Sequence, residues 1–497
     1  MNDDTGSIAS ETASGQARLL YENLIQKPRF DAVKSLYWSY LTRVDYAYAV
    51  IMCEQGLLSD NEVKLILKAM RRLEQEIDNS LAGGAPFPFS GQDYILDSRK
   101  YLYSLLPPGI GEKLYQYRNH DELLHAVLRM ALKDRLFVLA GILLSNLDGI
   151  LVNIKRNRGI GIPVSADMRS PIPVSWESYL LAHAELMLRD CKRFMDCLEQ
   201  IDVSPFGAGD GISEGIQLNR KRLSELLGFR SFQDSTLSPL MMNDGYRAVF
   251  ETLRQLFANV ALVTEELTRR IDASVIHIQT GNCLDMLQDA LGEIHMLALL
   301  AANTASSFSQ ITQYPQTACA GNTQFSLHIY GYRVFDSGVK AMRLIDAIFR
   351  SVKGTEVAFL EKLDREGQAL SQLTAYLIRN ERLSHDMVSA IVTKLGDKMT
   401  VQGITASQIT FNDFQALFHQ QTQKLPEMPE EKFLQLLSPY SYLSAHGISA
   451  SGSVLQEPLI ARYEKKSFDL RAHLDSYTRR IEQADQMLAR AVDSLII

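Results

Sequence analysis

The sequence predicts an all-α protein built around a central bundle of long helices. In two stretches the apolar residues recur every three or four positions, a spacing that places their side chains on one face of a helix. Such faces, on helices of about seven turns each, are typical of helices that lie side by side in a bundle. The first face is Leu180, Ala184, Met187, Cys191, Phe194, Leu198 and Ile201, and the second is Val249, Leu253, Leu256, Val260, Val263 and Leu267.

Composition and charge exclude several classes of protein. The 497 residues are 46% hydrophobic and 22% charged, which is typical of a globular chain with about two to four domains. The net charge is −7 without a long run of like charges, so we expect neither nucleic acid nor a membrane surface as a partner. Strictly apolar runs such as 136–144 are far shorter than the roughly 18 residues that span a bilayer.

The cysteines and the N-terminal residues indicate the cellular compartment. Five scattered cysteines without Cys-x-x-Cys spacing favour reduced thiols in the cytoplasm, without a disulfide framework or a zinc cluster. No other pattern calls for a metal or a cofactor. Residues 1–16 are small and polar, so we expect a disordered tail and not a signal peptide.

Helical periodicity recurs along the rest of the chain, and alternating strand patterns are nearly absent. Prolines and glycines separate the helices, as at Pro107-Pro108-Gly109. A middle of long helices between shorter ones predicts an N-terminal helical domain at 17–120, a central bundle at 121–380 and a C-terminal helical domain at 381–497. Besides the two helices above, we predict helices at 32–54, 59–78, 92–106, 121–154, 284–311, 325–349, 356–379 and 461–492.

Several segments resemble the argininosuccinate lyase family of the fumarase/aspartase superfamily, in family order and at family spacing. They are AVIMCEQGLLSDNEV (49–63), VSWESYLLAHAELMLRDCKRF (174–194), VSPFGAG (203–209), SELLGF (224–229) and SQLTAYLIRN (371–380). The resemblance implies a three-domain, fumarase/aspartase-type all-α subunit whose five-helix bundle joins three other copies in a homotetramer. It also implies active sites that are each built by three subunits.

The catalytic positions of that family are altered in this chain. The loop Thr-Gly-Ser-Ser-x-Met-Pro-Gln-Lys-x-Asn matches TGNCLDMLQDA (280–290), which places Cys283 at the position of the catalytic base. The Thr-His-Leu-Gln motif matches ADMR (166–169), so Asp167 replaces the histidine, while His295 replaces the glutamate that holds it. We hypothesise that Asp167 and His295 form a dyad with exchanged partners. The alternatives are a buried, inert cysteine and a packing or surface histidine.

The positions that bind the family's anionic substrate are altered as well. The Arg-Ser-Arg-Asn-Asp-Gln clamp matches residues 118–123, which makes Arg118 a candidate carboxylate anchor or, alternatively, a salt bridge at a helix start. A substrate-binding serine falls at Asp45. The acids here would repel a dicarboxylate and attract an amine or guanidinium, unless they form a solvated face. The acids are Asp45, Asp121 and Glu122, and the substrate-binding candidates are Arg118, Asn119, Asp121, Arg169, Asp45 and Asn322.

These observations leave two functions open. The first is a divergent enzyme that makes or breaks a C–N bond of an amino-acid-derived small molecule, by β-elimination or the reverse addition, but does not cleave argininosuccinate itself. The second is a catalytically silent homologue that acts as a ligand-binding or structural oligomer. Turnover that depends on Cys283 would favour the enzyme, whereas stabilisation by a ligand without turnover would favour the silent protein.

Overall fold

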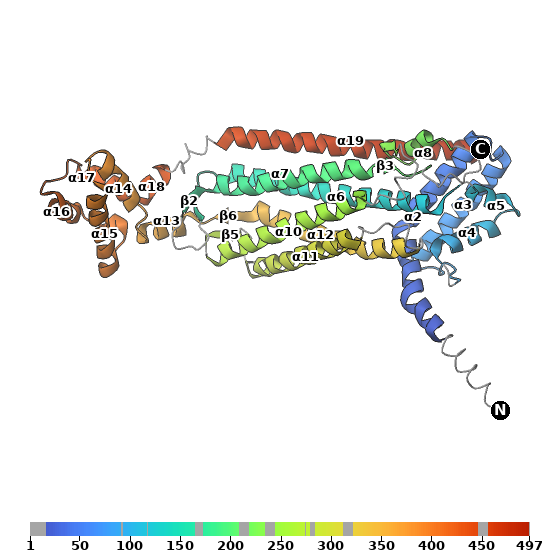
Figure 1. The fold of residues 1–497 in the computed structure, drawn as a ribbon, viewed down its shortest axis with the longest axis horizontal. Helices are drawn as coiled ribbons and strands as arrows, with labels where there is room; N and C mark the ends of the chain where they lie inside the picture. The colour runs from blue at the N-terminus through green and yellow to red at the C-terminus, as the bar shows by residue number, and fades with distance from the viewer. Residues whose placement is uncertain are drawn as a thin grey trace, which may run out of the picture.

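The computed structural model confirms an all-α protein with a central bundle of long helices (Figure 1). It describes residues 16–90, 93–116, 118–164, 172–207, 218–233, 244–273, 275–278, 284–311, 322–445 and 456–496. The bundle consists of α6 (His120–Arg156), α7 (Trp176–Ile201), α10 (Asp244–Asp272), α11 (Leu284–Ile311) and α12 (Asn322–Ser351). Each of these helices packs on two others in the closed order α6, α7, α10, α11, α12 and back to α6.

The two apolar faces predicted from the sequence form the inner surface of this bundle. Every residue of both faces is buried in α7 or α10. The start of α7 is fixed by Ser175, whose side chain accepts a hydrogen bond from the backbone N–H of Ser178 and so satisfies a donor of the first turn. The helix ends before the short strand β3 (Val203–Ser204).

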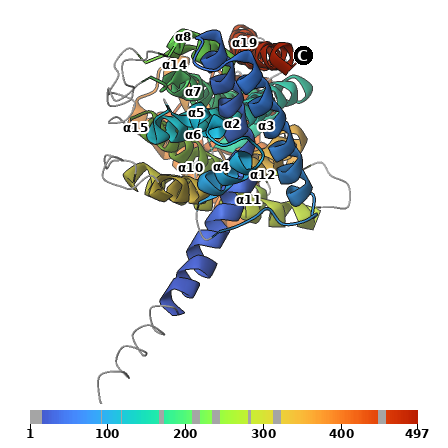
Figure 2. The same cartoon turned by 90° about the vertical axis from the view of Figure 1, so that its right-hand side faces the viewer.

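A further group of helices covers one end of the bundle, shown at the right of Figure 1 and facing the viewer in Figure 2. They are α2 (Lys27–Glu54), α3 (Asp60–Leu81), α4 (Tyr94–Ser104), α5 (Ile110–Tyr115) and α8 (Arg220–Leu226), with the π-turn η1 (Glu22–Gln26) before α2. The last helix, α19 (Glu457–Ile496), runs beside the bundle and contacts α6 and α7 before it reaches α2, α3 and α8.

A second apolar core lies at the opposite end of the bundle. Its elements follow α13 (Glu356–Arg365), and the predicted helix 356–379 is in fact divided around Gly367. This residue has φ +69°, a left-handed conformation that glycine adopts without strain, so it ends one helix and allows the chain to start another. The elements are α14 (Leu370–Arg379), α15 (His385–Gln402), η3 (Ala406–Gln408), α16 (Phe411–Thr422) and α17 (Glu430–Leu437). The next helix, α18 (Pro439–Ala445), packs on α17 and α13.

Three pairs of very short strands connect the helices. Strands β1 (Gly161–Val164) and β2 (Ile172–Ser175) form an antiparallel pair between α6 and α7. A parallel pair joins β3 to β4 (Ser231–Phe232), and an antiparallel pair joins β5 (Ile276–Ile278) to β6 (Val352–Gly354). With two to four residues each, these strands are too short for an alternating pattern to be visible in the sequence.

One helix, α6, is long and apolar enough to cross a membrane by length and composition alone. In this structure the helix forms one wall of the bundle and packs on α7, α12, α2 and α19. Of its most apolar 18-residue stretch, 61% is buried. Its apolar composition is therefore accounted for by its place in the protein core.

Candidate functional site

The candidate anchor Arg118 lies between α5 and α6 and forms an ion pair with Asp45 of α2. The Tyr115 hydroxyl donates a hydrogen bond to the other oxygen of the Asp45 carboxylate at 3.1 Å. Only 2% of the Arg118 side chain is exposed, and its guanidinium lies 4.6 Å from the centre of the Tyr115 ring and 5.2 Å from that of Tyr48. Two substrate-binding candidates thus satisfy each other within one chain.

The candidates beside Arg118 have structural roles at the start of α6. Asn119 is the N-cap, because its side-chain oxygen accepts hydrogen bonds from the backbone N–H groups of Asp121 at 2.7 Å and Glu122 at 3.4 Å. The Glu122 side chain is buried and accepts a hydrogen bond from the backbone N–H of Gly207 at 3.1 Å. Asp121 is partly exposed in the first turn. Glu122 is therefore not part of a solvated acidic face.

His295 lies on α11 and points toward α10, where its Nδ1 is 3.1 Å from the carbonyl oxygen of Ala261. A carbonyl only accepts hydrogen bonds, so Nδ1 carries the hydrogen, and Nε2 of the neutral ring is the proton acceptor. In this structure a backbone carbonyl therefore selects the tautomer of His295. The side chain of His295 is partly buried.

Three candidates, Asp167, Arg169 and Cys283, lie outside the described residues. The side chain of Asn322, the first residue of α12, lies outside them too. The proposed dyad therefore stays a prediction.

The neighbours of Asp167 and Arg169 in the sequence are firmly held. The carbonyl of Pro163 in β1 accepts a hydrogen bond from Arg270 at 2.7 Å, and the Glu177 carboxylate accepts one from the backbone N–H of Gly159 at 2.7 Å. In addition, the Trp176 ring donates to the Asn153 side chain at 2.9 Å. Arg270 and Glu177 are supporting residues that the sequence did not indicate.

Arg118 and strand β1 lie at opposite ends of α6. Arg118 precedes the helix and β1 follows it, and 37 helical residues separate their positions by about 55 Å. The start of α11 lies at the same end as β1, because β5 before it pairs with β6 and Gly354 of β6 packs against Ile162 of β1. Within one chain Arg118 is therefore far from β1 and from the start of α11.

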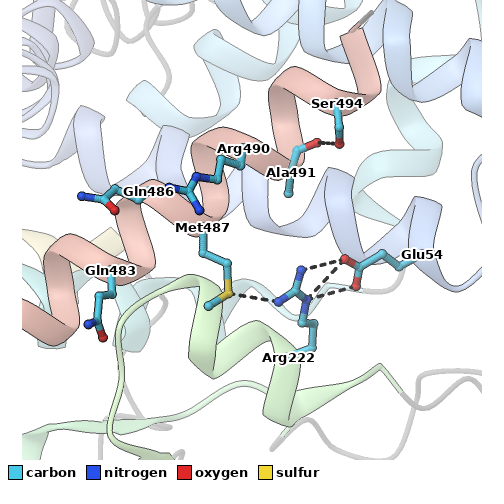
Figure 3. A pocket seen from close by; sticks show the side chains of 8 residues that line it. All are labelled: Glu54, Arg222, Gln483, Gln486, Met487, Arg490, Ala491 and Ser494. Atoms are coloured by element: carbon cyan, nitrogen blue, oxygen red, sulfur yellow. Dashed lines mark hydrogen bonds and ion pairs between the residues drawn. The ribbon is translucent and has the colours of Figure 1, made fainter.

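A groove of about 610 Å³ lies elsewhere, between α19, α2 and α8 (Figure 3). It is crossed by the ion pair between Arg222 and Glu54 at 3.0 Å, and the Arg222 guanidinium also contacts the Met487 sulfur at 3.0 Å. None of the predicted site residues lines it. Within the described part of the chain, no three His, Cys, Asp or Glu side chains are arranged to hold a metal ion.

Comparison with known proteins relates the chain to lyases. No family model matches the sequence. An argininosuccinate lyase 2 from Agrobacterium fabrum is 21% identical over 451 residues, which cover 88% of each chain. The argininosuccinate lyase of Methanocaldococcus jannaschii is 20% identical over 91% of this chain and 92% of its own.

Solved structures agree with the sequence comparison. EDDS lyase in complex with formate has a TM-score of 0.74 at 16% identity and covers 95% of this chain and 96% of its own. A class II fumarase from Schistosoma mansoni has a TM-score of 0.63 at 11% identity, with 84% and 91% covered. The fold is therefore that of the fumarase/aspartase-type lyases. In sequence the chain is a divergent homologue of argininosuccinate lyases, which confirms the resemblance of its motifs.

Proposed function

We propose that this protein is a divergent lyase that makes or breaks a C–N bond of an amino-acid-derived substrate, by β-elimination or by addition of an amine to an unsaturated acid. The observation that carries the proposal is the similarity to argininosuccinate lyases across about nine tenths of both chains. Argininosuccinate itself is not the expected substrate, because the residues at the catalytic positions differ from those of the family. The proposed location is the cytoplasm.

The reaction requires a base that removes a proton next to a carboxylate. Cys283 suits this role, because a thiol with an ordinary pKa near 8.5 is far closer to neutrality than a hydroxyl. Nε2 of His295 is a second candidate proton acceptor, because Nδ1 of the same ring is bonded to the Ala261 carbonyl. The negative charge of Asp167 would increase the basicity of this ring. The negative charge that develops on the substrate carboxylate needs donors fixed in advance.

The separation of the candidates supports a homotetramer with shared active sites. Groups about 55 Å apart in one chain can act together only if other copies supply the missing part. The outer faces of α10 and α11 also expose large apolar side chains, with exposed fractions of 62% for Leu262, 63% for Met296 and 57% for Leu300. Such a patch is rare on a monomer and suits the proposed contact with other copies.

The second candidate function, a catalytically silent homologue, has one observation in its favour. The arginine that the resemblance assigns to carboxylate binding is already paired with Asp45 of its own chain. A ligand would have to displace that carboxylate or bind elsewhere.

Turnover and its dependence on the candidates test the proposal. The protein is incubated with argininosuccinate, with fumarate plus amines, and with a panel of amino-acid derivatives, while the absorbance of the conjugated acid is followed. We expect turnover of at least one derivative and its loss in Cys283→Ala or in both Asp167→Ala and His295→Ala. Cys53→Ala is the matched control, since Cys53 lies on α2 and is not a candidate site residue. No turnover of any substrate, together with stabilisation by a ligand, would support the silent protein instead.

A further inference from the structure

The carboxylate anchor expected from the motif, Arg118, is not available to a ligand. Its side chain is 98% covered, and its charge is paired with Asp45, whose other oxygen accepts a hydrogen bond from Tyr115. Asp45 thus occupies the place at Arg118 that a substrate carboxylate would take. Any anion that binds here needs another cation.

A second guanidinium, Arg99 of α4, lies beside this pair. It lies over the same Tyr115 ring, 4.4 Å from its centre, and Arg99 is a partly buried residue. Among the residues that the structure describes, Arg99 has no ion-pair or hydrogen-bond partner, and its buried Nε has no acceptor. Two guanidinium groups, Arg99 and Arg118, therefore lie near the single carboxylate of Asp45.

The planar guanidinium of Arg99 suits a carboxylate ligand. Its N–H donors lie in one plane, where a carboxylate accepts two of them at once. The other groups near it are Tyr103 and His120, and His120 in turn lies near Asp93 and Asp121. Burial, and after it the charge of Arg99, lower the pKa of His120, so this ring is neutral at pH 7 and adds no competing charge.

We propose that Arg99 is the residue that binds a ligand carboxylate at this end of the molecule, while Arg118 is a positioning residue held by Asp45. The inference rests on the proposed function, because it names the group that receives the carboxylate of the substrate. It concerns binding alone, so it can be tested without turnover.

Calorimetric titration with fumarate and with succinate tests this proposal on the full chain. Loss of charge-assisted hydrogen bonds is worth roughly a ten- to hundredfold change in affinity, so Arg99→Gln should weaken binding by that factor. Arg99→Lys keeps the charge but loses the planar fork, and it should bind with intermediate affinity. Lys100→Gln removes the same charge from the next residue of α4, which is exposed, and should change the affinity less than about twofold.

Three results would overturn the inference: no binding of either acid by the wild-type protein, unchanged affinity in Arg99→Gln, or equal weakening in Arg99→Gln and Lys100→Gln. Thermal unfolding of each variant verifies that the fold is retained, which we expect because Arg99 has no bonded partner among the described residues. Failure of the proposed function has a different signature, since turnover would then be absent while binding still depended on Arg99.

Discussion

The ion pair between Lys133 of α6 and Asp202 after α7 offers a quantitative test of the structure. The side chains are 3% and 0% exposed, so the pair is buried. Lys133 also donates to the carbonyl of Gly228 at 3.0 Å, and Arg480 of α19 pairs with the second carboxylate oxygen. Replacing Asp202 with Asn keeps the shape and removes the charge that both cations share.

The expected cost follows from the fate of Lys133. Removing one partner of a buried pair costs about 3–5 kcal/mol, because the other charge stays buried. Lys133 can escape by losing its proton, and with an ordinary pKa of 10.5 this costs about 3 kcal/mol at pH 8. We therefore expect Asp202→Asn to lower the free energy of unfolding by about 3 kcal/mol at pH 8.

Urea unfolding at a fixed protein concentration measures this loss. In the variant Lys133 is neutral when the chain is folded and protonated when it is unfolded, so the unfolded chain binds one proton more. The free energy of unfolding should therefore rise by about 1.4 kcal/mol per pH unit below the ordinary pKa of lysine, more steeply than in the wild type. Arg480→Gln is the control, because its side chain is 31% exposed and its loss should cost about 1 kcal/mol at most. Equal effects of Asp202→Asn and Arg480→Gln, or no difference in pH dependence, would refute the reasoning.

Two other predictions concern packing and acid stability. A Cβ added at Gly338 of α12 would meet the Phe257 ring of α10 at 2.0 Å, so Gly338→Ala should lower the free energy of unfolding by about 1–3 kcal/mol in the same urea assay. The control is Gly141→Ala on α6, where the added Cβ meets open space, and it should be neutral or stabilising by up to about 1 kcal/mol. Similar values for both variants would contradict the packing of α12 on α10. Hydrogen bonds from Lys113, and then from Ser59, lower the pKa of Glu62 from 4.5 to about 2. The stabilising contribution of ionised Glu62 is therefore complete above pH 4.5 and is lost as the pH falls toward 2. Glu62→Gln should accordingly reduce the loss of stability between pH 4.5 and 2, whereas the exposed control Glu482→Gln should leave this pH dependence unchanged.

The bundle was predictable because its signal is local. The apolar faces of α7 and α10 repeat over many turns, and the predicted helix 284–311 has the same bounds as α11. The division of 356–379 was missed because one glycine outweighed the helical pattern on both sides of it, and the strands were missed because two to four residues show no alternation.

The candidate site was less predictable, because its contacts join distant parts of the chain. Arg118 meets Asp45 73 positions away, and no local pattern of either residue indicates the pairing. The sequence did not indicate Arg99 as a binding residue, because its contact with Tyr115 arises only from the packing of α4 on α5. The partner of His295 is the carbonyl of Ala261, and a backbone group leaves no trace in the residue types.

The last helix, α19, has a consequence for how the protein is made. Its terminal turns pair Arg480 with Asp202, Asp485 with Arg43 and Asp493 with Arg71, so residues near the C-terminus close contacts with segments synthesised much earlier. The bundle wall along α6 and α7 stays uncovered until α19 has been synthesised. Nascent chains that still lack α19 should therefore present an apolar flank to chaperones.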